Sequence, residues 1–160
     1  MQDKRSSSIL EQGIEPEAVK SLFGNADRNM IWHCQADPRF AFHGYVPDSV
    51  GEQNPPELTL LVIVHGTARG MEVHKDLYKD FCRQHNFALL LPIFPGGLID
   101  PDDYNSYKLL SYRGVRYDHV LLSMVEQFAA RFPSVRSDKF FITGHSGGGQ
   151  FANRFVLVHP

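Results

Sequence analysis

Three short apolar runs, separated by segments with helical periodicity, constrain the fold of this chain more than any other feature. The runs are LTLLVIVHG (58–66), FALLLPIFP (87–95) and KFFITG (139–144). Each is apolar almost throughout and shorter than an average helix, which is typical of a strand covered on both faces. Strands that alternate with helices predict right-handed crossovers and a parallel sheet with helices on both sides. The predicted fold class is therefore α/β.

The predicted helices carry apolar residues at helical spacing. We expect one helix over 71–85, a second over 115–132 that stops at Pro133, and a third from Gly147 to the end of the sequence. We expect these apolar positions to form the inward faces. They are Val73, Leu77 and Phe81 in the first helix, Val120, Met124, Phe128 and Phe132 in the second, and Phe151, Phe155 and Val158 in the third.

Aromatic and β-branched runs precede the apolar strands. MIWHCQA (30–36) and FAFHGYVP (40–47) flank a DPR turn, and they predict an antiparallel hairpin that opens the sheet. We divide the chain into a polar N-terminal segment with a short helix (1–28) and one α/β domain (29–160).

Composition excludes several functional classes. A formal net charge of -2 without long runs of one sign gives no field for nucleic acid or anionic lipid. We find no apolar core of a signal peptide and no stretch of ~18 apolar residues, so we expect a cytoplasmic protein without membrane association. Cys34 and Cys82 are far apart, which favours two buried, reduced thiols over a disulfide.

A serine flanked by glycines follows the third apolar run. Gly144, Ser146 and Gly148 spell G-x-S-x-G where a predicted strand turns directly into a predicted helix. Such a tight turn holds its central residue in strained geometry, and it brings the residues two before and two after it close together. The first N–H groups of the helix then point at whatever the serine attacks. The pattern predicts a nucleophilic Ser146, with the N–H of Gly147 facing a developing oxyanion.

A second donor for the same pocket is predicted at the end of the first apolar run, in HGTARG (65–70). Gly66 allows a sharp turn, and the N–H of Thr67 follows it. Ligand sites in open parallel sheets lie beyond the carboxyl ends of the strands, where both loops fall. His65 closes the strand, and we favour a hydrogen-bonded structural role for it over a contact with substrate.

Taken together, these motifs resemble the α/β-hydrolase family, specifically its esterases and polyester depolymerases. The resemblance covers 31–160 through YVP, LVIVHGT, LLLPIFP and FFITGHSGGGQFA. It implies a three-layer α/β sandwich that ends after the nucleophile helix. It also implies hydrolysis of a small or polymeric carboxylic ester, without metal or organic cofactor. The implied site consists of the nucleophile Ser146, the oxyanion donors Gly147 and Thr67, and the supporting residues Gly144, Gly148, His145, His65 and Gly66.

One departure from the family concerns the acid and base. In the family both follow the serine along the chain, yet the residues after Ser146 include no Asp or Glu. His159 would lie about 20 Å from Ser146 along a helix. We therefore predict that the acid and base are missing from this chain. The alternatives are a non-catalytic binding module or an inactive fragment.

Further features of the sequence lead to separate expectations. Without its last strands the sheet would keep an uncovered edge, through which the chain could self-associate. We interpret the three aspartates of IDPDDY (99–104) as a solvated loop rather than a metal site. The tyrosines of 104–112 either rim the pocket or pack the loop. We expect Asp118 and His119 at the surface.

Overall fold

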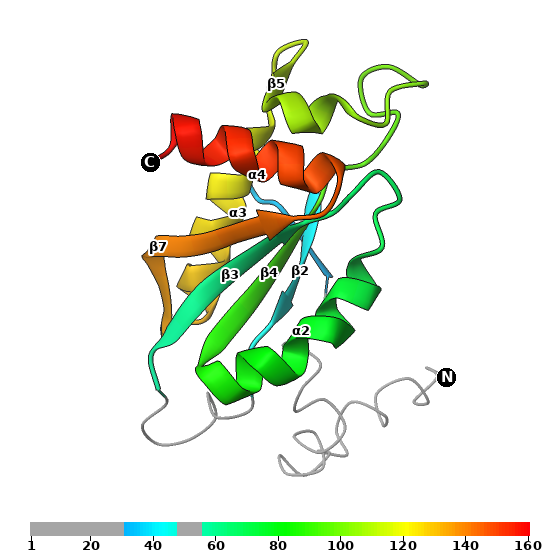
Figure 1. Ribbon diagram of the computed structural model, residues 1–160. Helices are drawn as coiled ribbons and strands as arrows, with labels where there is room; N and C mark the ends of the chain where they lie inside the picture. Colours follow the sequence, from blue (N-terminus) through cyan, green and yellow to red (C-terminus); the bar gives the residue numbers. More distant parts are fainter. Residues whose placement is uncertain (1–30, 48–55) are drawn as a thin grey trace, which may run out of the picture.

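The computed structural model describes residues 31–47 and 56–160, which form one α/β unit (Figure 1). The short helix expected within 1–28 lies outside the described residues. In chain order the elements are β1 (Ile31–His33), β2 (Ala41–Tyr45), β3 (Leu58–Val64), α2 (Met71–His85), β4 (Phe87–Ile93), η3 (Ser106–Leu109), β5 (Ser111–Tyr112), β6 (Val115–Arg116), α3 (Tyr117–Arg131), β7 (Val135–Gly144) and α4 (Gly147–Val158).

The main sheet has the strand order β1-β2-β4-β3-β7. β3 pairs in parallel with both β4 and β7, whereas β1 and β2 form the antiparallel hairpin, with β2 antiparallel to β4. The predicted parallel sheet opened by a hairpin is thereby confirmed. β7 forms one edge of this sheet.

Helices cover both faces of the sheet, as Figure 1 shows. The larger core lies on the face of α3 and α4, where Leu60, Val62 and Val64 of β3 point. The smaller core lies under α2, where Leu61 and Ile63 of the same strand point. Because successive side chains of a strand alternate between faces, burial on both sides explains why the sequence of β3 is apolar throughout.

The predicted inward face of α2 is wrong. Val73, Leu77 and Phe81 are 64%, 69% and 43% exposed, while Met71 and Cys82 of the same helix are buried against the sheet. Spacing shows that residues share a helical face, but the direction of that face depends on how the helix lies on the sheet. Both stripes of α2 are apolar, so periodicity alone did not distinguish them.

The inward faces of the other two helices are largely as predicted. In α3, Val120, Met124 and Phe128 are buried. In α4, Phe151 and Phe155 are buried, but Val158 is 54% exposed, because the last turn of the helix runs past the core.

The connection from β4 to α3 contains structure that the sequence analysis missed. It holds the short helix η3 and the hairpin β5–β6. The hairpin turns at Arg113 and Gly114, whose φ angles are 43° and 83°. Two successive positive φ angles are typical of the tight turns that join twisted strands, and the RG pair in YRGV was the signal for it.

Two expectations from composition can be compared with the structure. Cys34 and Cys82 are buried and unbridged, as predicted. In the described part of the chain, no helix has the length and apolar character needed to cross a bilayer.

Replacing Phe151 by alanine tests the larger core. The Phe151 side chain is fully buried, and its ring stacks on Phe94 at 5.3 Å between centroids. Removing such a ring leaves a cavity, so we expect Phe151→Ala to lower the free energy of unfolding by about 3 kcal/mol or more. Urea denaturation measures the change. Leu157→Ala, at an 83% exposed position of α4, is the control and should stay within about 0.5 kcal/mol of the parent.

Candidate active site

Ser146 occupies the turn between β7 and α4. It is the N-cap residue of α4, with φ 54° and ψ -117°, and its side chain is exposed. This region of backbone space is strained for any residue other than glycine. The surrounding structure holds a serine there, so the strain predicted from G-x-S-x-G is present at Ser146.

Close packing explains the two glycines of the motif. A Cβ atom at Gly148 would overlap the carbonyl oxygen of Val64 and lie 2.7 Å from that of His65. A Cβ atom at Gly144 would overlap the backbone of Gly148. The first turn of α4 therefore sits directly on the carboxyl end of β3, with no room for a side chain.

The loop after β3 lies beside the serine. A Cβ atom at Gly66 would be 3.6 Å from Cβ of Ser146 and 3.5 Å from Nδ1 of His145. The pairing of Val64 with Gly144 brings the two loops together, because parallel strands end at the same edge of the sheet.

Two backbone donors at this edge lack an acceptor within the described part of the chain. Among the described residues, no carbonyl accepts a hydrogen bond from the N–H of Thr67 or of Gly147. Gly147 is the first residue of α4, so its N–H belongs to the positive end of the helix. These are the two N–H groups that the sequence predicted for an oxyanion.

His65 is fully buried and uses both ring nitrogens. Its Nε2 accepts a hydrogen bond from the N–H of Phe94 (3.0 Å), so the proton lies on Nδ1, which donates to the carbonyl oxygen of Gly66 (2.8 Å). Burial lowers the pKa of His65 to about 4. This neutral imidazole links β4 to the loop after β3, and it has no free nitrogen to serve as a base.

Arg69 and Thr67 bind the loop after β3 to the connection between β4 and α3. The sequence analysis did not predict these contacts. Nε of Arg69 donates to the carbonyl oxygen of Phe94 (2.9 Å), and its Nη2 donates to that of Tyr104 (2.8 Å). Oγ1 of Thr67 donates to Oδ1 of Asn105 (2.8 Å). The sequence gives no signal for these bonds, because the partners are about 25 to 38 positions apart.

Tyr107 packs the site rather than rimming it. The side chain is buried, and its hydroxyl donates to the carbonyl oxygen of His65 (2.9 Å). Burial raises the pKa of Tyr107, which keeps this donor protonated. A Cβ atom at Gly147 would lie only 2.5 Å from the hydroxyl oxygen, so the Tyr107 side chain covers the start of α4. Tyr104, in contrast, is exposed.

A histidine and aspartate pair exists, but it lies at the other end of α4. Nε2 of His159 contacts Oδ2 of Asp118 at 3.0 Å, and Arg116 binds the same carboxylate through two nitrogens. Burial alone would raise the pKa of Asp118, but these hydrogen bonds outweigh it and hold that pKa below its usual range. The expectation of a surface Asp118 is wrong, because the side chain is fully buried; His119 is exposed as expected.

The described residues offer Ser146 neither a base nor a metal. No imidazole nitrogen in 31–47 or 56–160 forms a hydrogen bond to its hydroxyl. Across the same ranges, no group of three or more His, Cys, Asp or Glu side chains could hold a metal ion. In the aspartate-rich loop, Oδ1 of Asp103 accepts hydrogen bonds from the N–H groups of Asn105 and Ser106 and so stabilises a turn.

Comparison with solved structures places this arrangement among α/β-hydrolase folds. Poly(aspartic acid) hydrolase-1 from Sphingomonas sp. KT-1 is 22% identical, with a TM-score of 0.54 over 73% of this chain and 45% of its own. A poly(3-hydroxybutyrate) depolymerase from Bordetella parapertussis is 21% identical, with a TM-score of 0.56 over 72% of this chain and 41% of its own.

S-formylglutathione hydrolase from Staphylococcus aureus is 18% identical, with a TM-score of 0.57 over 81% of this chain and 51% of its own. No protein-family model and no curated protein matches the sequence. The chain thus has the α/β-hydrolase fold, as predicted, and spans about half or less of the length of these structures.

A pair of glycine substitutions tests the packing at the elbow. In Gly148→Ala the new methyl group would overlap the carbonyl oxygen of Val64, and backbone atoms on both sides leave it no space. We expect a loss of about 4 kcal/mol or more in the free energy of unfolding, or failure to fold. Gly70→Ala is the matched control, because a Cβ atom there meets nothing within 4 Å. Equal denaturation midpoints for the two variants would contradict this packing.

The buried neutral His65 predicts a loss of stability in mild acid. Its folded-state pKa of about 4 lies below the ordinary value of 6.5, so the unfolded chain binds more protons between these values. The contribution is complete above pH 6.5 and falls as the pH drops toward 4. From pH 7 to pH 5 we expect His65 to account for a loss of about 2 kcal/mol.

Urea denaturation at several pH values measures this effect. His65→Asn should be less stable than the parent at pH 7, yet it should show a smaller decrease between pH 7 and pH 5. Parallel pH profiles for the two proteins would rule out His65 as the source.

Proposed function

We propose that this chain carries the nucleophile and oxyanion donors of a serine hydrolase that cleaves carboxylic esters. One observation carries the proposal: Ser146 is held exposed in a strained turn beside two N–H groups that have no acceptor among the described residues. Evolution tolerates such strain mainly where a function requires it.

The proposed reaction is acyl transfer to water. Oγ of Ser146 attacks the ester carbonyl carbon and gives its proton to a base. The carbonyl oxygen becomes an oxyanion, which the N–H groups of Gly147 and Thr67 stabilise by hydrogen bonding. Collapse of this intermediate breaks the bond to the alcohol, which leaves with a proton from the protonated base. Water then releases the acid by the same steps and restores the serine.

The base and its acid partner come from outside the described residues. His65 is neutral with both nitrogens occupied, and His159 is bound to Asp118 at the far end of α4. His145 is adjacent to Ser146 but forms no hydrogen bond to it. We therefore propose that activation requires a histidine and a carboxylate on additional polypeptide.

The neighbours of this fold support the proposed substrate class. One solved structure with this fold is, by its name, a depolymerase of poly(3-hydroxybutyrate), which is a polyester. A small or polymeric ester is the proposed substrate, with no cofactor, because the proposed chemistry needs only the serine, the two donors and a base. The buried free thiols of Cys34 and Cys82 support a reducing, cytoplasmic location.

A non-catalytic binding module is the second candidate. The observation that favours it is the lack of a base beside Ser146 among the described residues. In that case the two unpaired N–H groups would bind a carbonyl or carboxylate oxygen without any covalent step.

Labelling with a fluorophosphonate, with and without added imidazole, tests the proposal. The probe phosphonylates a serine that a base can activate, and free imidazole can replace a missing histidine. We expect slow formation of one adduct, located on Ser146 by intact-mass and peptide analysis. Saturating imidazole should accelerate it by about 10²-fold, within the range of general-base catalysis. Ser146→Ala is the first control, and Ser123→Ala is a matched serine control that should label like the parent.

Two other outcomes of the labelling would contradict parts of this proposal. Rapid labelling without imidazole would show that a base already reaches Ser146, against the proposal of a missing base. No labelling of a folded protein under either condition would reject the nucleophile and favour the binding module.

A further inference from the structure

Lys108 of η3 lies beside the candidate site. Its Cδ atom is 3.9 Å from the place where a Cβ atom of Gly147 would be, so the side chain runs along the start of α4. The ammonium nitrogen is two bonds beyond Cδ, which places it roughly 9 Å or less from the backbone nitrogen of Gly147. Gly147 supplies one of the two N–H groups proposed to bind the substrate carbonyl. An ester bound there would therefore have its nearest atoms within reach of a cation.

Hydrogen bonds hold the backbone of Lys108 against α4. The N–H of Lys108 donates to the carbonyl oxygen of Asn105 (3.2 Å), and its own carbonyl oxygen accepts a bond from Nη1 of Arg154 on α4 (3.2 Å). The preceding residue, Tyr107, is buried and donates to the carbonyl oxygen of His65 after β3 (2.9 Å). The position of Lys108 relative to the start of α4 is therefore fixed by the fold.

The charge of Lys108 is not neutralised by the described residues. No carboxylate among them forms an ion pair with its ammonium group. Two aspartates of the same connection are engaged elsewhere. Asp103 accepts hydrogen bonds from two backbone N–H groups in its own turn, and Asp100 pairs with Arg113 at 3.4 Å. The ammonium is thus available to an anion from outside this part of the chain.

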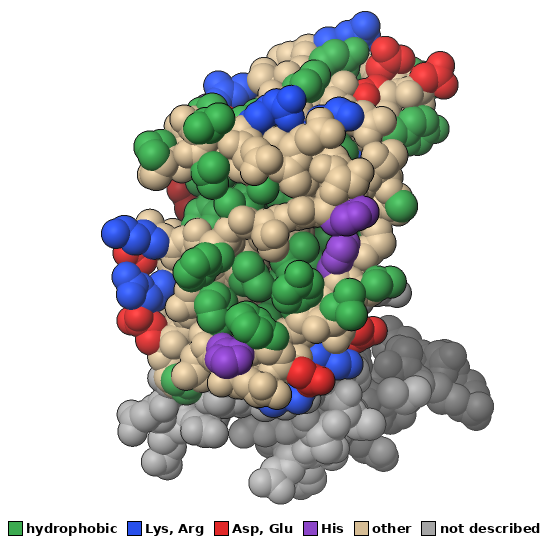
Figure 2. Space-filling model, viewed as in Figure 1, with side chains coloured by type: hydrophobic (Ala, Val, Ile, Leu, Met, Phe, Trp, Pro, Cys, Tyr) green, Lys and Arg blue, Asp and Glu red, His purple; other side chains and the backbone are tan. Residues whose placement is uncertain are grey.

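Two further cations belong to the same loop and helix. Arg69 donates to three carbonyl oxygens and Arg154 to two, and neither forms an ion pair within the described part of the chain. Figure 2 shows Lys and Arg side chains over α4 and the connection above it, with acidic side chains toward its right-hand end. Because the whole chain has a formal net charge of -2, this positive charge is a local feature. Such a local field favours a negatively charged ligand.

We propose that Lys108 determines the substrate specificity of this site by binding a second, ionised carboxyl group of the ester. The inference rests on the proposed function, since it names the substrate class of the same site. With a carbonyl oxygen on the N–H of Gly147 and a carboxylate on the ammonium, the reach given above corresponds to about three or four carbon atoms between the two groups. Hydrogen bonds between an ammonium and a carboxylate are roughly twice as strong as those between neutral groups. Short esters that carry a carboxylate should therefore be preferred over neutral ones.

Labelling with two fluorophosphonates tests the proposal. Both probes have the same length, but one ends in a carboxylate and the other in a primary amide, about three carbon atoms from phosphorus. Saturating imidazole is present in both reactions. We expect the carboxylate probe to label Ser146 of the parent about 10-fold faster than the amide probe, because only the carboxylate forms an ion pair with Lys108.

Removal of the charge should abolish this preference. Lys108→Met keeps the apolar stem but loses the ammonium, so the two labelling rates should become nearly equal. Their ratio cancels any change in the reactivity of Ser146 itself. Lys108→Arg keeps a positive charge and should retain most of the preference. Salt at about 0.5 M should lower the ratio of the parent by screening the ion pair, but not that of Lys108→Met.

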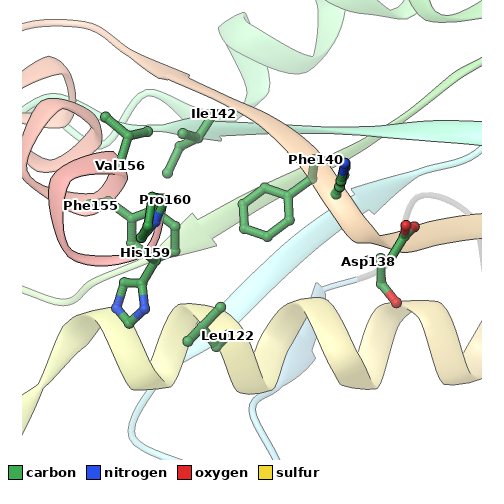
Figure 3. Close-up of a pocket in the computed structure, with 10 residues that line it drawn as sticks. Leu122, Asp138, Phe140, Ile142, Phe155, Val156, His159 and Pro160 are labelled. Carbon is green, nitrogen blue, oxygen red and sulfur yellow. The ribbon is translucent and has the colours of Figure 1, made fainter.

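Lys139→Met is the matched control. Lys139 is an exposed lysine on β7, beside a pocket of about 450 Å³ near the C-terminal end of α4. Figure 3 shows this pocket, in which Phe155 of α4 lies across from Phe140 of β7. Because the pocket lies at the opposite end of α4 from Ser146, loss of Lys139 should leave the ratio of the parent unchanged. Circular dichroism checks that each variant is folded, and Lys108→Gln replaces Lys108→Met if the latter is not.

Equal labelling rates of the two probes on the parent, or an unchanged ratio in Lys108→Met, would overturn the role of Lys108 and leave Ser146 as the nucleophile. Failure of both probes to label Ser146 would instead reject the proposed function.

In that second case, NMR titration of the parent with glutarate and with its monoamide tests Lys108 without any covalent step. Glutarate should shift the amide signals of Gly147 and Thr67 at about 10-fold lower concentration than the monoamide, and Lys108→Met should lose this difference. Equal affinities of the parent for the two compounds would overturn the proposal for binding as well.

Discussion

The contact between α4 and β3 is the constraint on which the rest of this structure depends. The first turn of α4 lies on the carbonyl oxygens of Val64 and His65, at a distance that only glycine at 148 permits. This contact fixes the start of the helix at the carboxyl edge of the sheet. Ser146 then has to bridge β7 and α4 in a strained conformation, and the loop at Gly66 lies against it. The position of the candidate site is a consequence of this packing.

Buried polar groups hold the loops around that contact. The imidazole of His65 links the N–H of Phe94 to the carbonyl of Gly66, and Tyr107 donates to the carbonyl of His65 itself. Arg69 adds bonds to carbonyl groups of the connection after β4. In a water-poor interior such networks are costly unless every member is satisfied, and they then specify one arrangement. The loop that carries Thr67 is therefore held by residues that take no part in the proposed reaction.

Burial is uneven across the sheet. The centre, at β3 and β4, is covered on both faces, whereas the outer half of β7 and one stripe of α2 remain apolar and exposed. The described residues therefore build only part of the candidate site and its surroundings. The backbone geometry around Ser146 is formed within the described residues, but they place no base at the serine and no neighbour on the edge strand that leads to it.

Local patterns in the sequence were enough for the class of fold, the parallel sheet with its hairpin, and the strained turn at Ser146. Apolar runs, four-residue spacing and the close approach of Gly144 to Gly148 all act over a few neighbouring positions. Spacing did not predict which stripe of α2 packs, because Met71 and Val73 belong to faces that are both apolar. Nor did it predict that Asp118 is buried or that the Tyr107 side chain covers the start of α4. These features depend on contacts between residues about 40 positions apart, and only the packing of the folded chain decides which of them form.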